Sequence, residues 1–382
     1  MTPAQTRLSL VAILSACVAY GIGMGLTLPL LSLILERMGV PGSINGFNLA
    51  TGGLAALLVT PYVPRWMART GAAEFLALSL VVSAAALLAL YEIPNLWLWF
   101  PVRFVVSSAL NALFVVTEFW INRLASENNR GRYIAVYVVC IAGSFGIGPA
   151  ILQFIGTRGI APFAAGSAML LVALVPVMLA RRTAPRIEDS ATTSIFSVVR
   201  AAPTAFAAAF VFGAIDAGMV GLLPVYAVRS GYTEAHAALC VTAMAVGSIV
   251  FQYPLGALAD HFSRRALLAL CAATGALGSA LTPFAVHSPM LLYLLLFLWG
   301  GLIPGVYSIG LTMLGQRYKG GDLANANAGF VILYSFGLLL GPAGEGVALD
   351  AWNPHGLLAV LGAICAAYVG FLLFRPAGSN PA

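Results

Sequence analysis

Twelve apolar stretches follow one another along this chain, and each is long enough to cross a lipid bilayer. They cover approximately residues 8–35, 43–64, 73–91, 95–122, 132–156, 161–181, 199–228, 235–259, 265–286, 289–315, 323–348 and 355–375. Hydrophobic residues make up 60% of the 382 residues and charged residues 8%, too few to cover the surface of an ordinary soluble domain. The sequence therefore predicts an all-α integral membrane protein, in which each span satisfies its own backbone hydrogen bonds.

Basic side chains are distributed unevenly between the two faces that alternating loops define. Fifteen fall on one face, namely Arg7, Arg65, Arg69, Arg123, Arg130, Arg132, Arg181, Arg182, Arg186, Arg200, Arg264, Arg265, Arg317, Lys319 and Arg375. Only Arg37, Arg158 and Arg229 fall on the other face, and Arg103 lies inside a span. Because cytoplasmic loops retain lysine and arginine, this bias predicts that both termini are cytoplasmic. The same loops account for the net charge of +6, so no nucleic-acid partner is expected.

The longest polar stretch between spans divides the chain into six spans and six spans. We expect an N-terminal repeat over residues 1–181, a cytoplasmic linker over 182–198 and a C-terminal repeat over 199–382. All five cysteines lie within predicted spans, so the sequence indicates no disulfide framework.

The two halves also resemble each other in short glycine- and proline-rich segments. Residues 23–29 in the first span, GMGLTLP, match residues 218–224 in the seventh, GMVGLLP. Residues 144–149 in the fifth span, SFGIGP, match residues 335–342 in the eleventh, SFGLLLGP. Equivalent spans of two parallel six-helix repeats are expected to match in this order.

The segment GALADHFSRR joins the eighth and ninth spans. It resembles the signature loop of the major facilitator superfamily, with Ser263 where the family has a glycine. Gly256 is expected to allow a close helix contact. Asp260 is expected to pair with Arg264 or Arg265 and so to latch one conformation. The resemblance implies twelve transmembrane helices in two six-helix pseudo-repeats, and a secondary transporter of a bacterial inner membrane.

Two features in and just after the fourth span add to this resemblance. The segments TEFWIN and NRGR, which carry Glu118, Arg130 and Arg132, resemble bacterial transporters of the YcaD type. These three residues are expected at a cytoplasmic gate or in a structural bridge, in which Glu118 pairs with Arg123 or Arg132, and a substrate contact is the alternative for Glu118. Arg103 stands in a stretch that resembles a superfamily motif whose arginine is linked to proton coupling. A structural ion pair is the alternative, because an arginine at this depth needs a partner or a wet cavity.

Asp216, in the middle of the seventh span, is the strongest candidate for a substrate or proton site. A carboxyl group enclosed by apolar side chains can bind and release a proton near neutral pH. A structural, hydrogen-bonded acid is the alternative. Glu345, near the outer end of the eleventh span, is expected either to reach the membrane interface or to line a cavity open to the outside. The other polar side chains expected at the substrate site are Tyr20, Asn111, Tyr226, Gln252 and Tyr334.

His236, Cys240 and Met244 recur every four residues along the eighth span. This spacing places imidazole, thiol and thioether groups on one stripe of a helix. A soft metal such as Cu(I) favours such ligands, although cysteine and methionine more often serve as core packing. A soft-metal or metal-chelate importer is therefore an alternative function.

The sequence as a whole predicts a secondary active transporter that moves a small solute by alternating access, coupled to H⁺. Uptake and efflux are both compatible with the pattern. The expected partners are the solute, protons and the lipid bilayer, with no cofactor. The chain has no phosphate-binding loop, zinc-type ligand cluster or nucleophile triad, so an enzyme is not expected. A non-transporting membrane receptor or scaffold on the same fold is the alternative from another class.

Overall fold

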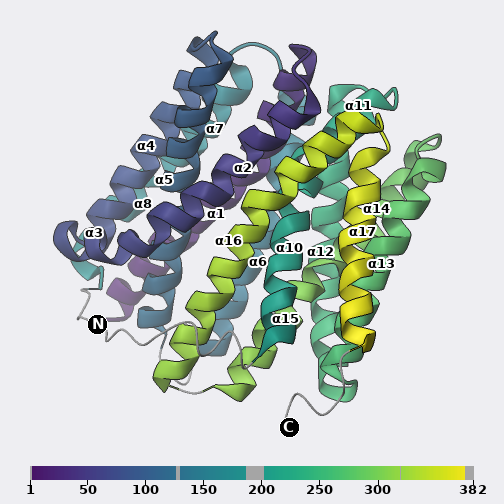
Figure 1. Cartoon of the computed structure of the whole chain (residues 1–382). Coiled ribbons are helices and arrows are strands. Elements are labelled where there is room, and N and C mark those ends of the chain that lie inside the picture. The colour runs from purple at the N-terminus through teal and green to yellow at the C-terminus, as the bar shows by residue number, and fades with distance from the viewer. Residues whose placement is uncertain (1, 126–129, 186–201, 319, 375–382) are drawn as a thin grey trace. The chain divides into compact units, whose positions relative to one another are not determined.

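The computed structural model describes residues 2–125, 130–185, 202–318 and 320–374, most of which are helical (Figure 1). Twelve helical stretches in these ranges are long and apolar enough to cross a membrane, which confirms the predicted number of spans. Four of the cations assigned to the cytoplasmic face, Arg186, Arg200, Lys319 and Arg375, lie outside the described residues, as does most of the predicted linker.

Short connections join successive helices on each side of the predicted linker. The helices before the linker are α1 (Pro3–Arg37), α2 (Gly42–Val59), α3 (Val63–Thr70), α4 (Ala72–Glu92), α5 (Leu96–Leu124), α6 (Arg130–Ile155), α7 (Ala161–Val172) and α8 (Leu174–Leu179). Short 3₁₀ turns, η1 (Thr60–Tyr62) and η2 (Arg181–Thr183), precede α3 and follow α8. Those after it are α10 (Pro203–Gly221), α11 (Leu223–Arg229), α12 (Glu234–His261), α13 (Arg264–Ala285), α14 (Pro289–Leu302), α15 (Pro304–Arg317), α16 (Gly320–Ala351) and α17 (Gly356–Phe374).

Three predicted spans are each built from two helices. The predicted sixth span is α7 followed by α8, and Pro176 lies in the first turn of α8. The predicted seventh span is α10 followed by α11, and Pro224 lies in the first turn of α11. The predicted tenth span is α14 followed by α15, which begins at Pro304. A proline has no backbone N–H and its ring clashes with the preceding turn, so it is accommodated where a new helix starts.

The chain forms two compact units. The first contains residues 1–34 and 54–190, and the second contains residues 35–53 and 191–382. Because the boundaries at 34 and 53 fall inside α1 and α2, these two helices contribute residues to both units.

Glycine allows a close helix contact in the first unit, where α1 meets α6. Gly25 lies against the backbone carbonyl of Phe145, and Gly148 lies against the backbone of Gly25 and Leu26. A side chain at either glycine would collide with the facing backbone. Small residues favour helix association in lipid because they let the two backbones approach closely and gain van der Waals contact. Hydrophobic burial cannot drive this association, since the lipid tails are themselves apolar.

The second unit repeats this arrangement where α10 meets α16, which lie side by side in Figure 1. Gly213 lies against the carbonyl of Tyr334, and Gly337 lies against the backbone of Phe210 and Ala214. The glycines of both contacts lie in or near the segments that match between the two halves of the sequence. The matched segments therefore make the same kind of contact within each unit.

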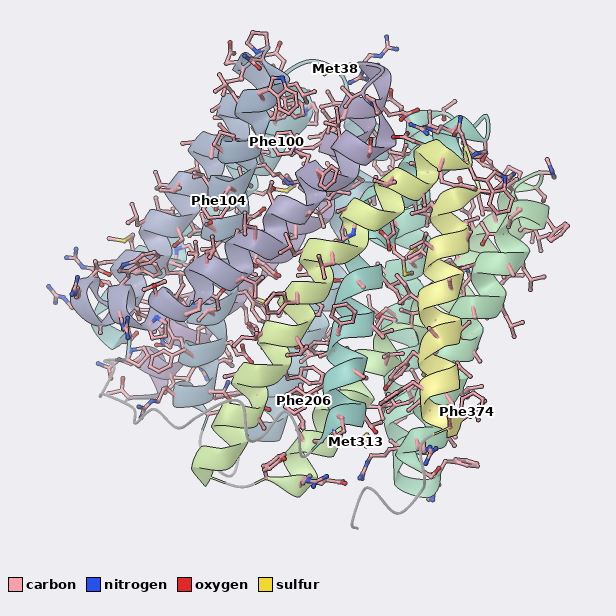
Figure 2. All side chains as sticks on the ribbon, in the orientation of Figure 1. Met38, Phe100, Phe104, Phe206, Met313 and Phe374 are labelled. Carbon is pink, nitrogen blue, oxygen red and sulfur yellow. The ribbon has the colours of Figure 1, made fainter. Side chains whose placement is uncertain are left out.

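Large apolar side chains project outward along the helices (Figure 2). Met38 is 50% exposed and Phe374 is 89% exposed, whereas Phe206 is buried in a cluster with Leu314 and Phe330. A soluble protein rarely exposes so much apolar surface. The described chain therefore has the surface of a multi-pass membrane protein.

The glycine contacts predict the effect of adding one methyl group to α16. Gly341 lies against the backbone of Ala214, whereas Gly344, one turn further on, faces open space. Gly341→Ala should lower the stability of the protein by about 1–3 kcal/mol because α10 and α16 must separate. Gly344→Ala should leave stability unchanged or raise it slightly, since alanine is the better helix former. Thermal unfolding of the two purified variants in detergent measures the difference, and equal melting temperatures would contradict this account of the contact.

Candidate functional site

Asp216 and Tyr334 form a polar pair inside the second unit. Asp216 lies on α10 and Tyr334 on α16, and the tyrosine hydroxyl donates a hydrogen bond of 2.7 Å to Asp216 Oδ2. Both residues are half-buried. The glycine contacts between the two helices bring these side chains within reach, so the structure joins two residues that the sequence analysis proposed separately.

Aromatic rings surround this pair. Tyr307 packs edge-on against Tyr334, with ring centroids 5.4 Å apart, and Phe212 stacks on Tyr334 at 5.9 Å. Tyr307 also packs edge-on against Phe330 at 5.0 Å. A hydrogen bond in such an apolar setting is electrostatically stronger than one in water. The rings also offer flat apolar faces on which a ring-shaped solute could stack.

Glu345, on α16, is a second carboxyl group that faces α10. Its side chain is completely buried, and neither carboxyl oxygen has a hydrogen-bond partner among the described residues. The Glu345 carboxyl group lies against Gly218, where any side chain would collide with it. The two acids, Glu345 and Asp216, interact electrostatically. Glu345 thus does not reach the membrane interface in this conformation. The only sequence feature that indicated its close contact with α10 was its position between Gly344 and Gly346.

Arg103 is the buried cation of the first unit. It lies on α5, is 2% exposed, and its Nη1 atom has no hydrogen-bond partner among the described residues. No ion pair to Arg103 is found among the described side chains. A structural ion pair was the alternative for this residue, and the described side chains include no partner for one.

Tyr20 and Asn111 also belong to the first unit. The ring of Tyr20, on α1, packs against Phe114 of α5 with centroids 5.4 Å apart. Asn111 is half-buried on α5, one turn before Phe114. These two predicted site residues therefore approach the same part of α5, and Arg103 lies about two turns earlier on that helix.

The residues predicted for a cytoplasmic gate lie at the C-terminal end of α5 and the start of α6. Glu118 is exposed, and its backbone carbonyl accepts a hydrogen bond of 2.8 Å from the side chain of Asn122. Arg123 lies over the ring of Phe119 at 5.7 Å. The side chains of Arg130 and Arg132 lie outside the described residues.

The signature loop consists of the end of α12, residues 262 and 263, and the start of α13. Ser263 caps α13, because its hydroxyl accepts a hydrogen bond of 3.2 Å from the backbone N–H of Ala266. Serine is a preferred residue at this position of a helix, which gives a reason for its replacing the usual glycine. Arg265 donates a hydrogen bond to the backbone carbonyl of Leu372 on α17.

Two other predictions concern α12 and its loop. Nothing described lies within 4 Å of the point where a side chain would begin at Gly256, so the close helix contact expected there is not made in this conformation. The Asp260 side chain and its expected pairing lie outside the described residues, and Arg264 is half-buried. Gln252 is exposed on α12.

Tyr226 is completely buried on α11. Its ring packs against His355, which follows α16, with centroids 6.0 Å apart. Tyr226 therefore lies against the connection between α16 and α17 rather than in the aromatic group around Tyr334.

The stripe of potential soft-metal ligands has other contacts in this structure. His236 is exposed, and its Nδ1 atom is 2.8 Å from the hydroxyl of Thr233. Cys240 is buried and donates a weak hydrogen bond to the carbonyl of His236, and Met244 packs against Gly300 of α14. In the described ranges, no group of three or more histidine, cysteine, aspartate or glutamate side chains is placed to hold a metal ion.

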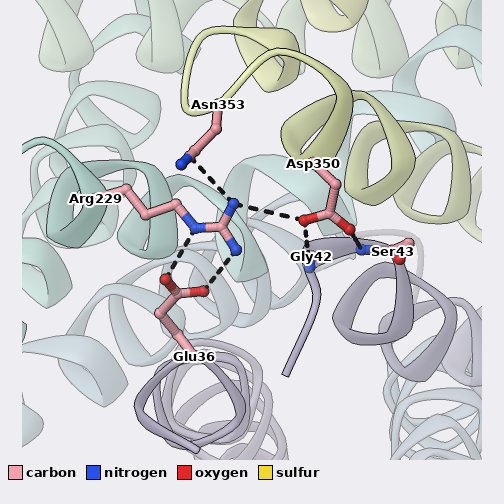
Figure 3. A network of polar contacts seen from close by, with 6 residues as sticks. All are labelled: Glu36, Gly42, Ser43, Arg229, Asp350 and Asn353. Atoms are coloured by element: carbon pink, nitrogen blue, oxygen red, sulfur yellow. Dashed lines mark hydrogen bonds and ion pairs between the residues drawn. The ribbon is translucent and has the colours of Figure 1, made fainter. Parts of the chain in front are cut away.

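A network of charged groups, which the sequence analysis did not identify, lies at one end of the second unit (Figure 3). Arg229, the last residue of α11, donates two hydrogen bonds to Glu36, of 2.8 and 2.9 Å. The same guanidinium lies 3.6 Å from Asp350, whose carboxylate accepts hydrogen bonds of 2.7 and 2.8 Å from the backbone N–H groups of Gly42 and Ser43. Asp350 thus stabilises the N-terminus of α2, where the helix dipole favours negative charge.

Arg37 extends this network through an ion pair of 3.0 Å with Glu234. Arg37 and Arg229 are two of the three cations that the sequence places on the non-cytoplasmic face. Burial by itself would lower the pKa of Arg229, but its hydrogen bonds to Glu36 and the charges of Glu36 and Asp350 outweigh burial and raise that pKa. The guanidinium therefore stays charged, and residues 36–43 are held to α11 and the end of α16.

Comparison with known proteins identifies the family. The family model described as Major Facilitator Superfamily matches residues 12–239 and 230–382. This chain belongs to the Major Facilitator Superfamily. The members of this superfamily are transporters rather than enzymes. The match confirms the resemblance seen in the signature loop.

Relatives and solved structures agree with this assignment. The MFS-type transporter YfkF of Bacillus subtilis (strain 168) is 24% identical over 369 residues, which cover 95% of this chain and 94% of the relative. The MFS-type transporter YcaD of Escherichia coli (strain K12 / DH10B) is 26% identical over 337 residues, 87% of this chain and 85% of the relative. Both relatives carry the description "uncharacterized".

Two crystal structures show the same fold at low sequence identity. The nucleoside transporter NupG superposes with a TM-score of 0.74 at 15% identity, covering 98% of both chains. A D-xylose-proton symporter superposes with a TM-score of 0.71 at 15% identity, covering 98% of this chain and 99% of the symporter. The Major Facilitator Superfamily fold of this chain thus extends over its whole length.

The Arg229 network predicts a graded loss of stability on substitution. Arg229→Ala should lower the stability of this superfamily member by about 1–3 kcal/mol, because two charge-assisted hydrogen bonds and one ion pair are lost. Arg229→Lys should lie between Arg229→Ala and the unmodified protein, since lysine keeps the charge but not the two-pronged geometry. Thermal unfolding at low and high salt measures both effects.

Arg158→Ala is the matched control, because Arg158 is an exposed arginine predicted for the same membrane face. It should leave the melting temperature unchanged. Equal melting temperatures for Arg229→Ala and Arg158→Ala would show that the network contributes nothing to stability.

Proposed function

We propose that this chain is a proton-coupled secondary active transporter that moves a small solute across a bacterial inner membrane by alternating access. Membership of the Major Facilitator Superfamily supports the transport mode. The observation that carries the coupling is the hydrogen bond from Tyr334 to Asp216 on two closely packed membrane helices.

Asp216 is the proposed proton-binding group. Its carboxylate accepts the hydrogen bond from Tyr334, and this interaction is stronger for the ionised than for the neutral acid. When a proton arrives, the carboxyl group can donate a hydrogen bond itself and remains only a weaker acceptor, so its bond with Tyr334 weakens and the tyrosine side chain is freer to turn. Because Tyr334 packs against Tyr307 and Phe212, its movement rearranges the rings at which a solute could bind. Proton binding and solute binding would then affect each other through one side chain.

Arg103 is the proposed contribution of the first unit. A buried guanidinium without an ion pair is costly within a membrane, and such residues in membrane proteins usually serve substrate or ion pathways. Arg103 therefore supports the proposal as a second charged group, one that gains and loses a partner of opposite charge during the transport cycle.

The solute is proposed to be small and to contain a ring. The support is the aromatic group around Tyr334, together with the fold shared with a nucleoside transporter and a D-xylose-proton symporter. Nucleosides and D-xylose are accordingly the first compounds to test, with thermal stabilisation of the purified protein as the screen.

Transport into proteoliposomes tests the coupling directly. For a neutral solute carried with one proton, an imposed gradient of about one pH unit should drive about tenfold accumulation. Asp216→Asn should abolish this accumulation, because asparagine cannot carry the proton. Tyr334→Phe should shift the pH profile of transport to higher pH, since the carboxylate loses the hydroxyl that stabilises it. A pH-sensitive dye trapped in the vesicles reports the proton movement.

The control for these variants is Glu92→Gln, which removes an exposed carboxyl group at the end of α4. It should transport like the unmodified protein. Solute flux that is indifferent to the imposed pH gradient would refute proton coupling while leaving transport itself intact.

The proposed location places both termini in the cytoplasm. Fluorescent-protein fusions, which do not fold in the periplasm after ordinary secretion, should fluoresce at either terminus. Single cysteines introduced at Arg158 or Met38, on the predicted outer face, should react with an impermeant thiol reagent added to intact spheroplasts. Labelling at Arg69, on the predicted cytoplasmic face, should require permeabilised cells. The reverse pattern would overturn the orientation.

The two alternatives from the sequence remain predictions. A soft-metal importer would be stabilised against heat by Cu(I) in a manner that depends on His236 and Cys240. A receptor or scaffold without transport would show no flux of any solute, and neither Asp216→Asn nor Arg103→Ala would change ligand uptake. No contact in the described residues favours either alternative.

A further inference from the structure

We propose that Glu345 is a second proton-binding group of this protein, and that it carries its proton in the conformation described here. The role of this proton in coupling rests on the proposed function, whereas its presence on Glu345 does not. The inference begins from a carboxyl group that is completely buried and whose two oxygens both lack a hydrogen-bond partner among the described residues.

An ionised carboxylate in this position would be a buried charge without compensation. Removing an unpaired charge from water is far more costly than removing a neutral polar group, so buried acids in such places become neutral. A neutral carboxylic acid at Glu345 leaves one donor and one acceptor unsatisfied, which is the smaller penalty. The geometry therefore favours the protonated form.

Among the described residues, the titratable groups that interact electrostatically with Glu345 are acidic. On α10 the titratable neighbour is Asp216, and on α17 it is Cys365, both of which interact electrostatically with Glu345. On α15, Tyr307 packs instead against the ring of Tyr334. The helix α2 carries no titratable side chain. Each neighbour would become neutral or negative, so none stabilises a carboxylate at Glu345.

The two acids of this unit have opposite environments. Asp216 receives a hydrogen bond from Tyr334, which stabilises its ionised form, whereas no described residue donates one to Glu345. Two interacting carboxyl groups avoid being ionised together, so a proton on one depends on the state of the other. Such a pair can hold one proton firmly and exchange the other.

The helix turn that carries Glu345 is closed on two sides. Gly218 of α10 lies against the Glu345 carboxyl group, and the next residue, Gly346, lies against Gly42 and Gly46 of α2. The N-terminus of α2 is in turn held by hydrogen bonds to Asp350. Separation of α2 from α16 would open this turn to water and allow Glu345 to ionise, so its proton is released only when that contact opens.

The test uses the full-length protein in detergent and needs neither a solute nor a gradient. Glu345→Gln keeps the size of the neutral acid but cannot lose a proton. The melting temperature of the unmodified protein should fall as the buffer is changed from mildly acidic to alkaline, because ionisation creates a buried charge. In Glu345→Gln that fall should be largely lost, and in the control Glu92→Gln it should be retained. An undiminished fall in Glu345→Gln would overturn the proposal.

Infrared spectroscopy provides a second measurement, which remains decisive if Glu345→Gln does not fold. Asp216→Asn removes the other interacting acid, yet at neutral pH it should still show the carbonyl band of a protonated, buried carboxyl group. That band should disappear in alkaline buffer, and its absence at neutral pH would refute the proposal. Addition of Na⁺ at alkaline pH should not restore the melting temperature, and restoration would show a metal-ion site instead of a proton site.

These outcomes are separate from those of the flux experiment. Transport that ignores a pH gradient, combined with the expected infrared band, would refute proton coupling but keep the Glu345 site. Coupled transport that is lost in Asp216→Asn, combined with no such band, would refute the Glu345 site but keep the proposed function.

Discussion

The absence of water from the interior of a bilayer is the constraint on which the rest of this structure depends. Backbone N–H and C=O groups there must bond within their own segment, so every span is a helix. Hydrophobic burial does not hold such helices together, because lipid tails are as apolar as leucine. Close contact takes its place, and glycine provides it where α1 meets α6 and where α10 meets α16.

The same close contact creates the candidate site. Because Gly213 and Gly337 let α10 and α16 approach backbone to backbone, polar side chains on the two helices are forced together. Asp216 meets the hydroxyl of Tyr334, and Glu345 fills the space left by Gly218. The two acids therefore differ in one described hydrogen-bond donor, and different surroundings can give two carboxyl groups different proton affinities.

Hydropathy and charge patterning predicted much of this architecture because both follow from the membrane. The number of spans, the signature loop and the candidacy of Asp216 and Tyr334 could all be read from residue order. The break between α10 and α11 could not, because a proline inside an apolar run is compatible with a kink as well as with a new helix start. The pairing of Arg229 with Glu36 could not be predicted from the sequence either, since the two residues are almost two hundred positions apart in the chain.

Residue order alone determined that this chain crosses a membrane twelve times and belongs among transporters, because the length of apolar runs and the placement of cations respond to the bilayer directly. Tertiary structure alone decided which polar groups have partners. Helix rotation and contact distance leave Glu345 without a donor among the described residues and give Asp216 a tyrosine hydroxyl. Hydropathy specifies neither the rotation nor the distance, because the mean hydropathy of a span is the same whichever side of the helix faces its neighbour.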